Sequence, residues 1–284
     1  MFSPAPVWAA VLVVAALLLT GCSSGDGAAQ GAGGSPSPGS SSSTSGEPSA
    51  PAEAAVPQNE QCYPLTAAEV AKPSNESEPV DCAEPHTAQT FLVATFPAKL
   101  KNAGYDDPRL GATVYENCNP AFIKFLGGGE SMSMRSLLSW GWFRPSQQDW
   151  DAGARWFRCD LLGAPSGDST LTALPTQAKG MLSARPPEDW MLCAKGDDVG
   201  SAPRVPCAQP HDWRAVTTIV LGEKRDPYPG DHVVEVRSRQ FCSDSVGAWL
   251  NYPVTNYDYG ATAFHEGEWK AGNRRSICWA RTSR

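Results

Sequence analysis

The chain has 284 residues and a formal net charge of -7 at pH 7. Acidic residues outnumber basic ones, 30 to 23, and residues 23–60 contribute four acids and no base, which leaves a charge of only -3 on residues 61–284. This mild acidity argues against nucleic acid as a partner and against electrostatic adhesion to anionic lipid.

The N-terminus has the pattern of an export signal. Residues 7–20 are almost wholly apolar, a run shorter than the roughly twenty residues that cross a membrane comfortably, and they end in Leu19-Thr20-Gly21-Cys22. These four residues resemble the bacterial lipobox, although residues 1–8 lack Lys and Arg. We therefore predict a lipoprotein signal peptide over residues 1–21 and lipidation of Cys22, with an ordinary secretory signal as the alternative. A diacyl anchor would hold the protein on the outer face of the cell membrane.

Residues 22–60 predict a tether. They consist mainly of Gly, Ser, Pro and Ala. Such a segment buries too little apolar surface to offset the entropy of ordering it, so we expect it to be disordered.

A repeat organises the rest of the chain. The pattern W-x-A-G-x-R-x3-C begins at Trp150 and again at Trp269, and each copy follows an aromatic-glycine pair by ten residues. Upstream, Cys-Ala-x-Pro-His occurs at residues 82–86 and 207–211. Two modules follow from this duplication, module 1 over residues 61–163 and module 2 over residues 188–284.

The connector, residues 164–187, is long for a structureless loop in a compact protein. We therefore allow a short helix or strand over Leu171 to Ser183.

The pattern of each module predicts an α+β fold, a small and mostly antiparallel sheet with one packed helix. In module 1 the helix should begin near Asp107-Pro108 and stop at the glycines 127–129. In module 2, Asp231 is the expected N-cap. Apolar residues four, seven and eight positions after a cysteine mark the buried face of each helix, at Phe122, Phe125 and Leu126 and at Val246, Trp249 and Leu250.

Eight cysteines in an exported chain indicate disulfides rather than metal thiolates. If each module closes on itself, its four cysteines allow three connectivities. We favour pairing the first with the second and the third with the fourth, so that one bridge ties a hairpin-like loop and the other clamps the helix to the last strand. The predicted pairs are Cys62 with Cys82, Cys118 with Cys159, Cys193 with Cys207 and Cys242 with Cys278.

The order of these motifs resembles the septum formation domain of actinobacterial exported and membrane-anchored proteins. The motifs V-x-C-x2-P-H, at residues 80–86 and 205–211, and W-x-A-G-x-R-x3-C carry the resemblance, which covers most of residues 61–284 as two copies. It implies a role at the division septum or cell envelope and implies no reaction. The first copy departs in a longer gap between Cys62 and Cys82, which predicts a surface loop over residues 73–79.

Three repeated pairs are candidate binding residues. His86 and His211 could act as ligands or general bases, or could fix a turn through a backbone carbonyl. Arg155 and Arg274 could clamp a carboxylate or phosphate, or could cap a helix or pair with an acid of their own module. Trp150 and Trp269 could be sugar platforms or core residues. Some aromatic residues of one module have no counterpart in the other. We predict that these form a surface patch: Trp142, Phe143, Tyr252, Tyr257 and Tyr259.

No enzyme motif accompanies the repeat. Residues 61–284 lack G-x-S-x-G, S-x-x-K, H-E-x-x-H, G-x-x-x-x-G-K and C-x-x-C. We therefore expect no catalytic residue, no metal and no cofactor, and a protein that binds an envelope or division partner. The alternatives are a module that binds wall glycan or peptide, and an enzyme acting on the wall with His86 or His211 as base beside Glu84 or Asp212.

Overall fold

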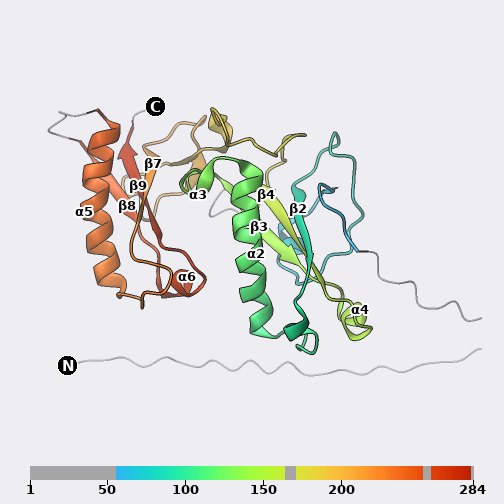
Figure 1. The fold of residues 1–284 in the computed structure, drawn as a ribbon. Helices are drawn as coiled ribbons and strands as arrows, with labels where there is room; N and C mark the ends of the chain where they lie inside the picture. The colour runs from blue at the N-terminus through green and yellow to red at the C-terminus, as the bar shows by residue number, and fades with distance from the viewer. Residues whose placement is uncertain (1–55, 164–170, 252–256, 283–284) are drawn as a thin grey trace, which may run out of the picture. The chain divides into compact units, whose positions relative to one another are not determined.

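In the computed structural model of the protein, residues 56–163, 171–251 and 257–282 are described (Figure 1). The predicted signal peptide, Cys22, most of the predicted tether and Tyr252 lie outside these ranges. No helix within them combines the length and apolar character that crossing a membrane requires.

Module 1 is a four-stranded antiparallel sheet in the order β1-β2-β4-β3. The strands are β1 (Cys62–Tyr63), β2 (Ala88–Thr95), β3 (Leu138–Phe143) and β4 (Trp156–Gly163). One long helix, α2 (Pro108–Leu126), contacts β2 and β4. Short helices fill the connections: α1 (Ala67–Val70), η1 (Ala98–Leu100), α3 (Gly129–Met134) and α4 (Gln147–Asp151).

Module 2 repeats this arrangement with one more strand, in the antiparallel order β6-β5-β7-β9-β8. Its strands are β5 (Leu192–Ala194), β6 (Arg204–Pro206), β7 (Trp213–Val220), β8 (Tyr259–Thr262) and β9 (Arg275–Arg281), and its helices are η2 (Glu188–Trp190), α5 (Asp231–Trp249) and α6 (Glu266–Lys270). Figure 1 shows α2 and α5 each lying along the sheet of its own module. The predicted α+β class with antiparallel sheets is confirmed.

A shared irregularity supports the duplication. The register of β2 against β4 shifts between Thr90 and Leu92, and that of β7 against β9 shifts between Ala215 and Thr217. After the shift, Leu92 lies opposite Cys159 and Thr217 lies opposite Cys278, which are equivalent cysteines. A bulge at the same place in both sheets bends both in the same way.

The helix of module 1 has the predicted ends. The Asp107 side chain accepts a hydrogen bond from the Arg109 N–H at 2.9 Å, Pro108 is the first helical residue, and Gly127 ends the helix with φ 80°. In the left-handed region a side chain would be strained, which explains the glycine. The next helix, α3, begins immediately at Gly129.

In module 2 the predicted cap is wrong by one residue. Gly230, with φ 93° and ψ 148°, is the N-cap of α5, and Asp231 is the first helical residue. The positive φ of the cap position suits glycine and disfavours other residues. Gly230 therefore occupies the cap, and Asp231 lies in the first turn of α5. There its carboxylate accepts hydrogen bonds from Tyr228 and His265.

The four disulfides of the structure are those predicted. Cys118–Cys159 joins α2 to β4, and Cys242–Cys278 joins α5 to β9. The other two, Cys62–Cys82 and Cys193–Cys207, close loops of 20 and 14 residues. Every bridge therefore stays inside its own module and clamps equivalent positions.

Residues 171–183 form neither a helix nor a strand, so the expectation of a short element there is wrong. The segment is nevertheless packed, because Leu174, Ala178 and Leu182 are buried against module 1. Instead of forming regular secondary structure, the segment donates backbone hydrogen bonds to carbonyl groups of α2. Gly180 N–H donates to Phe125, and Leu182 N–H donates to Leu126.

The tether ends earlier than predicted. The Asn59 side chain accepts a hydrogen bond from the Val93 N–H at 2.7 Å, and the Glu60 N–H donates to the Thr90 carbonyl at 2.8 Å. Residues 59 and 60 thus pair with β2 as part of module 1. The predicted surface loop over residues 73–79 has no helix or strand.

Leu137 and Trp190 each pack against the core of the other module. Leu137, which precedes β3, is buried in the core of module 2 beside Leu192 and Trp213, whereas Trp190 of η2 packs into the core of module 1. Two backbone hydrogen bonds of 2.9 Å frame the exchange, from Leu137 N–H to Trp190 and from Leu192 N–H to Arg135. Residues 61–163 and 188–284 therefore pack against each other through apolar contacts.

Removing the helix-to-strand bridge should cost module 2 much of its stability. The bridge closes a separation of 36 residues, and loop-closure arithmetic gives about 4 kcal/mol for that length. We expect Cys242→Ala with Cys278→Ala to lower the free energy of unfolding by this order in urea titrations. The matched control, Cys193→Ala with Cys207→Ala, closes a separation of 14 residues and should cost about 3 kcal/mol.

Non-reducing peptide mapping checks the pairing itself. A bridge from any residue below 164 to one above 187 would contradict closure within modules.

Candidate functional site

Both repeated histidines hold turns. His86 and His211 are buried, and each donates from Nδ1 to the carbonyl two residues earlier, to Glu84 at 2.9 Å and to Gln209 at 2.7 Å. Each imidazole therefore fixes the turn that leads into β2 or β7. This geometry matches the structural alternative that the sequence allowed for these residues.

The repeated Arg and Trp residues form a stacked pair in each module. Arg155 lies over the Trp150 ring at 4.1 Å, and Arg274 lies over the Trp269 ring at 3.6 Å. Each guanidinium also donates to the carbonyl of the same tryptophan at 2.6 Å, in the last turn of α4 or α6. Further bonds from Arg155 to Lys101 and from Arg274 to Glu223 engage backbone carbonyls. The arginines thus cap short helices, which is one of the expected alternatives.

Both tryptophans are core residues. Trp150 is 3% exposed and Trp269 is 5% exposed. Their indole N–H groups donate to the Ala103 and Asp226 carbonyls. Stacking between the ring and the guanidinium above it leaves neither tryptophan with an open face for a sugar.

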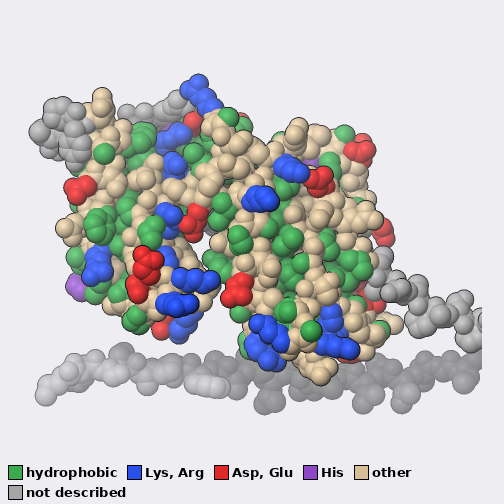
Figure 2. Space-filling model, in the orientation of Figure 1, with side chains coloured by type: hydrophobic (Ala, Val, Ile, Leu, Met, Phe, Trp, Pro, Cys, Tyr) green, Lys and Arg blue, Asp and Glu red, His purple; other side chains and the backbone are tan. Residues whose placement is uncertain are grey.

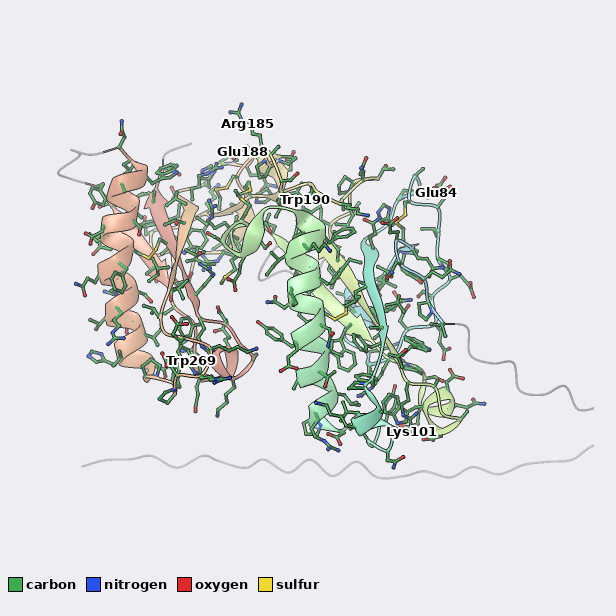
Figure 3. The ribbon with its side chains drawn as sticks, viewed as in Figure 1. Glu84, Lys101, Arg185, Glu188, Trp190 and Trp269 are labelled. Carbon is green, nitrogen blue, oxygen red and sulfur yellow. A yellow bond between two sulfur atoms is a disulfide. The ribbon has the colours of Figure 1, made fainter. Side chains whose placement is uncertain are left out.

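The candidate residues do not converge. The histidine lies before β2 and the Arg-Trp pair lies beyond its other end, and an eight-residue strand spans roughly 25 Å. In Figure 3, Glu84 and Lys101, whose carbonyls accept from His86 and Arg155, mark opposite ends of module 1. No composite site joins the repeated residues.

The acid and base pairs considered for catalysis are not formed. The Glu84 side chain is exposed, whereas His86 is buried with its Nδ1 bound to a backbone carbonyl. In module 2, the Asp212 carboxylate accepts from the Gly196 N–H at 2.8 Å, and His211 bonds Gln209. Within the described residues, no three His, Cys, Asp or Glu side chains are grouped to hold a metal ion.

The predicted patch of aromatics without counterparts is wrong for Phe143. This residue is fully buried and lies under the Arg158 guanidinium, 4.8 Å from the ring centroid. Trp142 is partly exposed, and Tyr257 and Tyr259 lie on module 2 with ring centroids 6.2 Å apart. These aromatics therefore lie in different parts of the molecule.

A buried ion pair in β4 was not predicted. Arg158 and Asp160 lie 3.1 Å apart and are 2% and 0% exposed. The Asp160 carboxylate accepts from the Thr90 hydroxyl at 2.7 Å, and Arg158 donates to Asn75 at 2.9 Å and stacks over Tyr63. Burial raises the pKa of Asp160, an effect that Arg158 opposes. Two charges in a strand that is otherwise apolar were the available sequence signal.

Module 2 has apolar residues where module 1 has this pair. The sheet registers place Arg158 and Ile277 at equivalent positions, as well as Asp160 and Trp279. The Trp279 indole donates to the Thr262 hydroxyl at 3.0 Å. Arg158 donates to Asn75 in the loop of residues 73–79, which is longer in module 1. We infer that the ion pair anchors this loop and is not a feature of the shared fold.

A cavity lies between residues of the two modules. It measures about 860 Å³ and adjoins a second of about 370 Å³, and the two share Tyr115, Asn119, Glu130, Trp140 and Ala271. We call the combined space the intermodule cleft. Clefts of this order hold small molecules or segments of chain. Its module 1 wall comes from α2, α3 and β3. Its module 2 wall comes from the end of β7, α6, the start of β9 and the turns between them, and it includes the repeated residues Trp269 and Arg274.

Aromatic rings and charges of both signs line the intermodule cleft. Tyr115 and Trp140 have ring centroids 6.0 Å apart, and Trp142 lies on the same strand as Trp140. Glu130 accepts from Arg275 at 2.6 Å across the modules. Figure 2 shows acidic, basic and hydrophobic side chains on the surface of the two modules. Such a lining suits a ligand with apolar and polar parts.

Tyr115 shows how closely the cleft walls approach. A Cβ on Gly272 would lie 2.8 Å from Cε1 of the Tyr115 ring. Burial raises the pKa of Tyr115, and Glu130 adds to this effect. The hydroxyl group therefore stays protonated and available as a donor at neutral pH. Sequence alone gave no signal for Tyr115, because it lies on α2 without a repeated counterpart.

In comparison with protein families, the chain matches the family described as septum formation over residues 31–143 and again over residues 101–278. The predicted resemblance is thereby confirmed, and finding the family twice is consistent with two tandem copies. The bounds of the two matches differ from those of the modules. No match was found among curated proteins or among solved structures.

Breaking the buried ion pair should be far more costly than replacing it. We expect Asp160→Ala to lower the free energy of unfolding by about 3 to 5 kcal/mol, because it leaves the Arg158 charge buried and unpaired. The double variant Arg158→Met with Asp160→Leu should cost less than Asp160→Ala alone in urea titrations. A double variant that is less stable than the single one would contradict the reading of this pair as an anchor of the loop.

Substituting each of the two repeated glycines distinguishes backbone strain in the turn from side-chain packing in the intermodule cleft. Gly153 and Gly272 both have φ 107°, but only Gly272 faces a side chain of the other module. Alanine at either position should destabilise its own turn by about 1 to 2 kcal/mol. Only Gly272→Ala should displace the Tyr115 ring, which would lower its pKa toward the ordinary value of about 10. An NMR titration of Tyr115 in both variants checks this, and an equal shift in Gly153→Ala would contradict it.

Proposed function

Because the chain belongs to the septum formation family, we propose that it is a non-catalytic protein of the cell envelope whose two modules bind a division or wall protein. The observation that carries the proposal is a contrast within the described residues. The repeated histidine and arginine side chains bind backbone carbonyls of their own modules, whereas the intermodule cleft presents aromatic and charged groups from both modules, Trp269 and Arg274 among them.

An extracytoplasmic location is supported by the four disulfides and by the family. Disulfides form and persist in oxidising compartments. Lipidation of Cys22 would add an anchor on the outer face of the membrane, and residues 23–58 would then give the modules reach from that anchor. At the composition of this segment, the root-mean-square reach is roughly 35 Å. The modules could therefore contact partners near the membrane or in the inner wall.

The intermodule cleft favours a polypeptide ligand. Its lining has both charge signs in Glu116, Glu223, Lys224 and Lys270, together with the aromatic rings of module 1. A segment of protein can present donors, acceptors and apolar groups to such a surface. The packing of Leu137 and Trp190 across the modules would keep the two walls in register before the partner arrives, which lowers the entropic cost of binding.

A second candidate is wall glycan, and one observation favours it. Trp140 and Trp142 lie on β3, are partly exposed and both line the cleft. Indole faces exposed in a cleft suit the apolar face of a sugar. The cleft would then bind a glycan strand in place of a protein segment.

Site-specific photo-crosslinking tests the proposal. A photo-reactive residue in place of Glu116, which is exposed in the cleft, should crosslink to a discrete envelope protein in native membranes. The matched control replaces Val236, which is 50% exposed on α5 and outside the cleft. We expect a crosslinked protein from position 116 and none from position 236. Crosslinks to insoluble wall material alone would favour the glycan candidate, and equal products from both positions would contradict a role for the cleft.

A further inference from the structure

The connector covers the end of α2 in module 1, whereas Trp249 at the end of α5 in module 2 is exposed. In module 1, Leu174, Ala178 and Leu182 pack against Phe122, Phe125, Leu126 and Leu161, at the C-terminal end of α2 and the facing strand. The covered surface is closed to solvent, since Phe125 is 8% exposed and Leu126 is 0% exposed.

Backbone hydrogen bonds hold the connector in place. Gly180 N–H donates to the Phe125 carbonyl at 2.8 Å, and Leu182 N–H donates to the Leu126 carbonyl at 2.9 Å. The last carbonyls of a helix lack partners within the helix, so they are ready acceptors for a passing chain. Leu174 N–H donates to the His86 carbonyl at 2.8 Å, which fixes the other end of the segment. These bonds depend on backbone atoms and not on side-chain identity.

The same positions in module 2 can be assigned from the repeat. Counting from the helix cysteines, Trp249 corresponds to Phe125 and Leu250 to Leu126. On the sheet, Trp140 faces Leu161 and Tyr259 faces Ala280, which makes these two pairs equivalent. The face formed by Trp249, Leu250, Tyr257 and Tyr259 is called the Trp249 face.

The Trp249 face is open where its counterpart is covered. The spacing from Cys242 predicts that Trp249 shares a buried face with Val246, yet it is 47% exposed, and Tyr259 is 38% exposed. Val246 and Ala280, the counterparts of Phe122 and Leu161, are buried within module 2 itself, so the exposed part of this face lies at the end of α5 and at Tyr259. A tryptophan half in solvent is a common setting for a binding anchor.

We propose that the Trp249 face binds an extended, apolar segment of a partner protein, as module 1 binds residues 171–182 of its own chain. The segment would place leucine-sized side chains beside Trp249 and donate backbone N–H groups at the end of α5. This inference rests on the proposed function only in that the partner is a protein. It concerns a surface separate from the intermodule cleft, whose lining residues do not include Trp249, Tyr257 or Tyr259.

The molecule itself supplies the probe. A labelled peptide with the sequence of residues 171–183 should bind the purified full chain, in detergent, with saturable anisotropy. Trp249→Ala should weaken the binding on the order of tenfold or more, because hot-spot tryptophans carry a large share of binding energy. A peptide with Leu174→Ser and Leu182→Ser should bind more weakly than the parent to the unsubstituted chain.

Val236→Ala is the matched control. Val236 is 50% exposed on the same helix and lies thirteen residues before Trp249, about 140° away around α5 at 100° per residue. Its substitution should leave peptide binding unchanged. Tyr259→Ser is a second variant of the Trp249 face, in case Trp249→Ala disturbs the end of α5, and urea unfolding of each variant verifies the fold.

Absence of saturable binding up to about 1 mM peptide would overturn the inference, because a Kd of 1 mM corresponds to only about 4 kcal/mol of binding free energy. Binding that is equally strong in Trp249→Ala and Tyr259→Ser would also overturn it. Because crosslinking from position 116 reads the intermodule cleft, a negative peptide result leaves the proposed function standing. Conversely, failure of the crosslinking experiment does not decide whether the peptide binds.

Discussion

The exchange of Leu137 and Trp190 between the modules is the contact on which the proposed binding site depends. Each side chain is inserted into the core of the other module, and the two framing hydrogen bonds leave little freedom at the junction. An apolar side chain buried in a neighbour's core stabilises docking by removing its surface from water. Without this contact, disulfides would still hold each module together, but polar contacts such as that of Arg275 with Glu130 would be left to hold the walls of the intermodule cleft in place.

Because the module is duplicated, the structure of each copy can be compared with that of the other. The disulfides, the stacked Arg-Trp pairs and the histidine turns recur, so they belong to the shared architecture. Among the described residues, the buried Arg158–Asp160 pair and the connector packed on the long helix occur on the side of module 1 alone. Features unique to one copy are better guides to the function of this chain than the repeated motifs, because the repeated side chains bind their own backbone.

The sequence was sufficient for much of the fold and little of the site. Cysteine order identified the disulfides, since a helix-to-strand clamp and a loop closure fit the spacing, and Asp107-Pro108 with Gly127 set the ends of α2. The short helix α4 went unpredicted, although Ser146 caps it by accepting from the Asp149 N–H. Tyr115, Leu137 and Trp190 could not be assigned, because their roles come from packing between residues far apart in the chain. Trp249 follows the helical period of a buried face and is exposed, because periodicity places a residue on a face but cannot say what covers it.

Native-state hydrogen exchange at two amides tests the central claim most directly. The Leu137 and Leu192 N–H groups donate across the modules, to Trp190 and Arg135. If the modules dock through the exchanged side chains, both amides should exchange as slowly as sheet amides near the disulfides, such as that of Cys278. If both amides exchange at the rate of exposed chain while the sheets stay protected, the modules are independent and the account of the cleft is wrong.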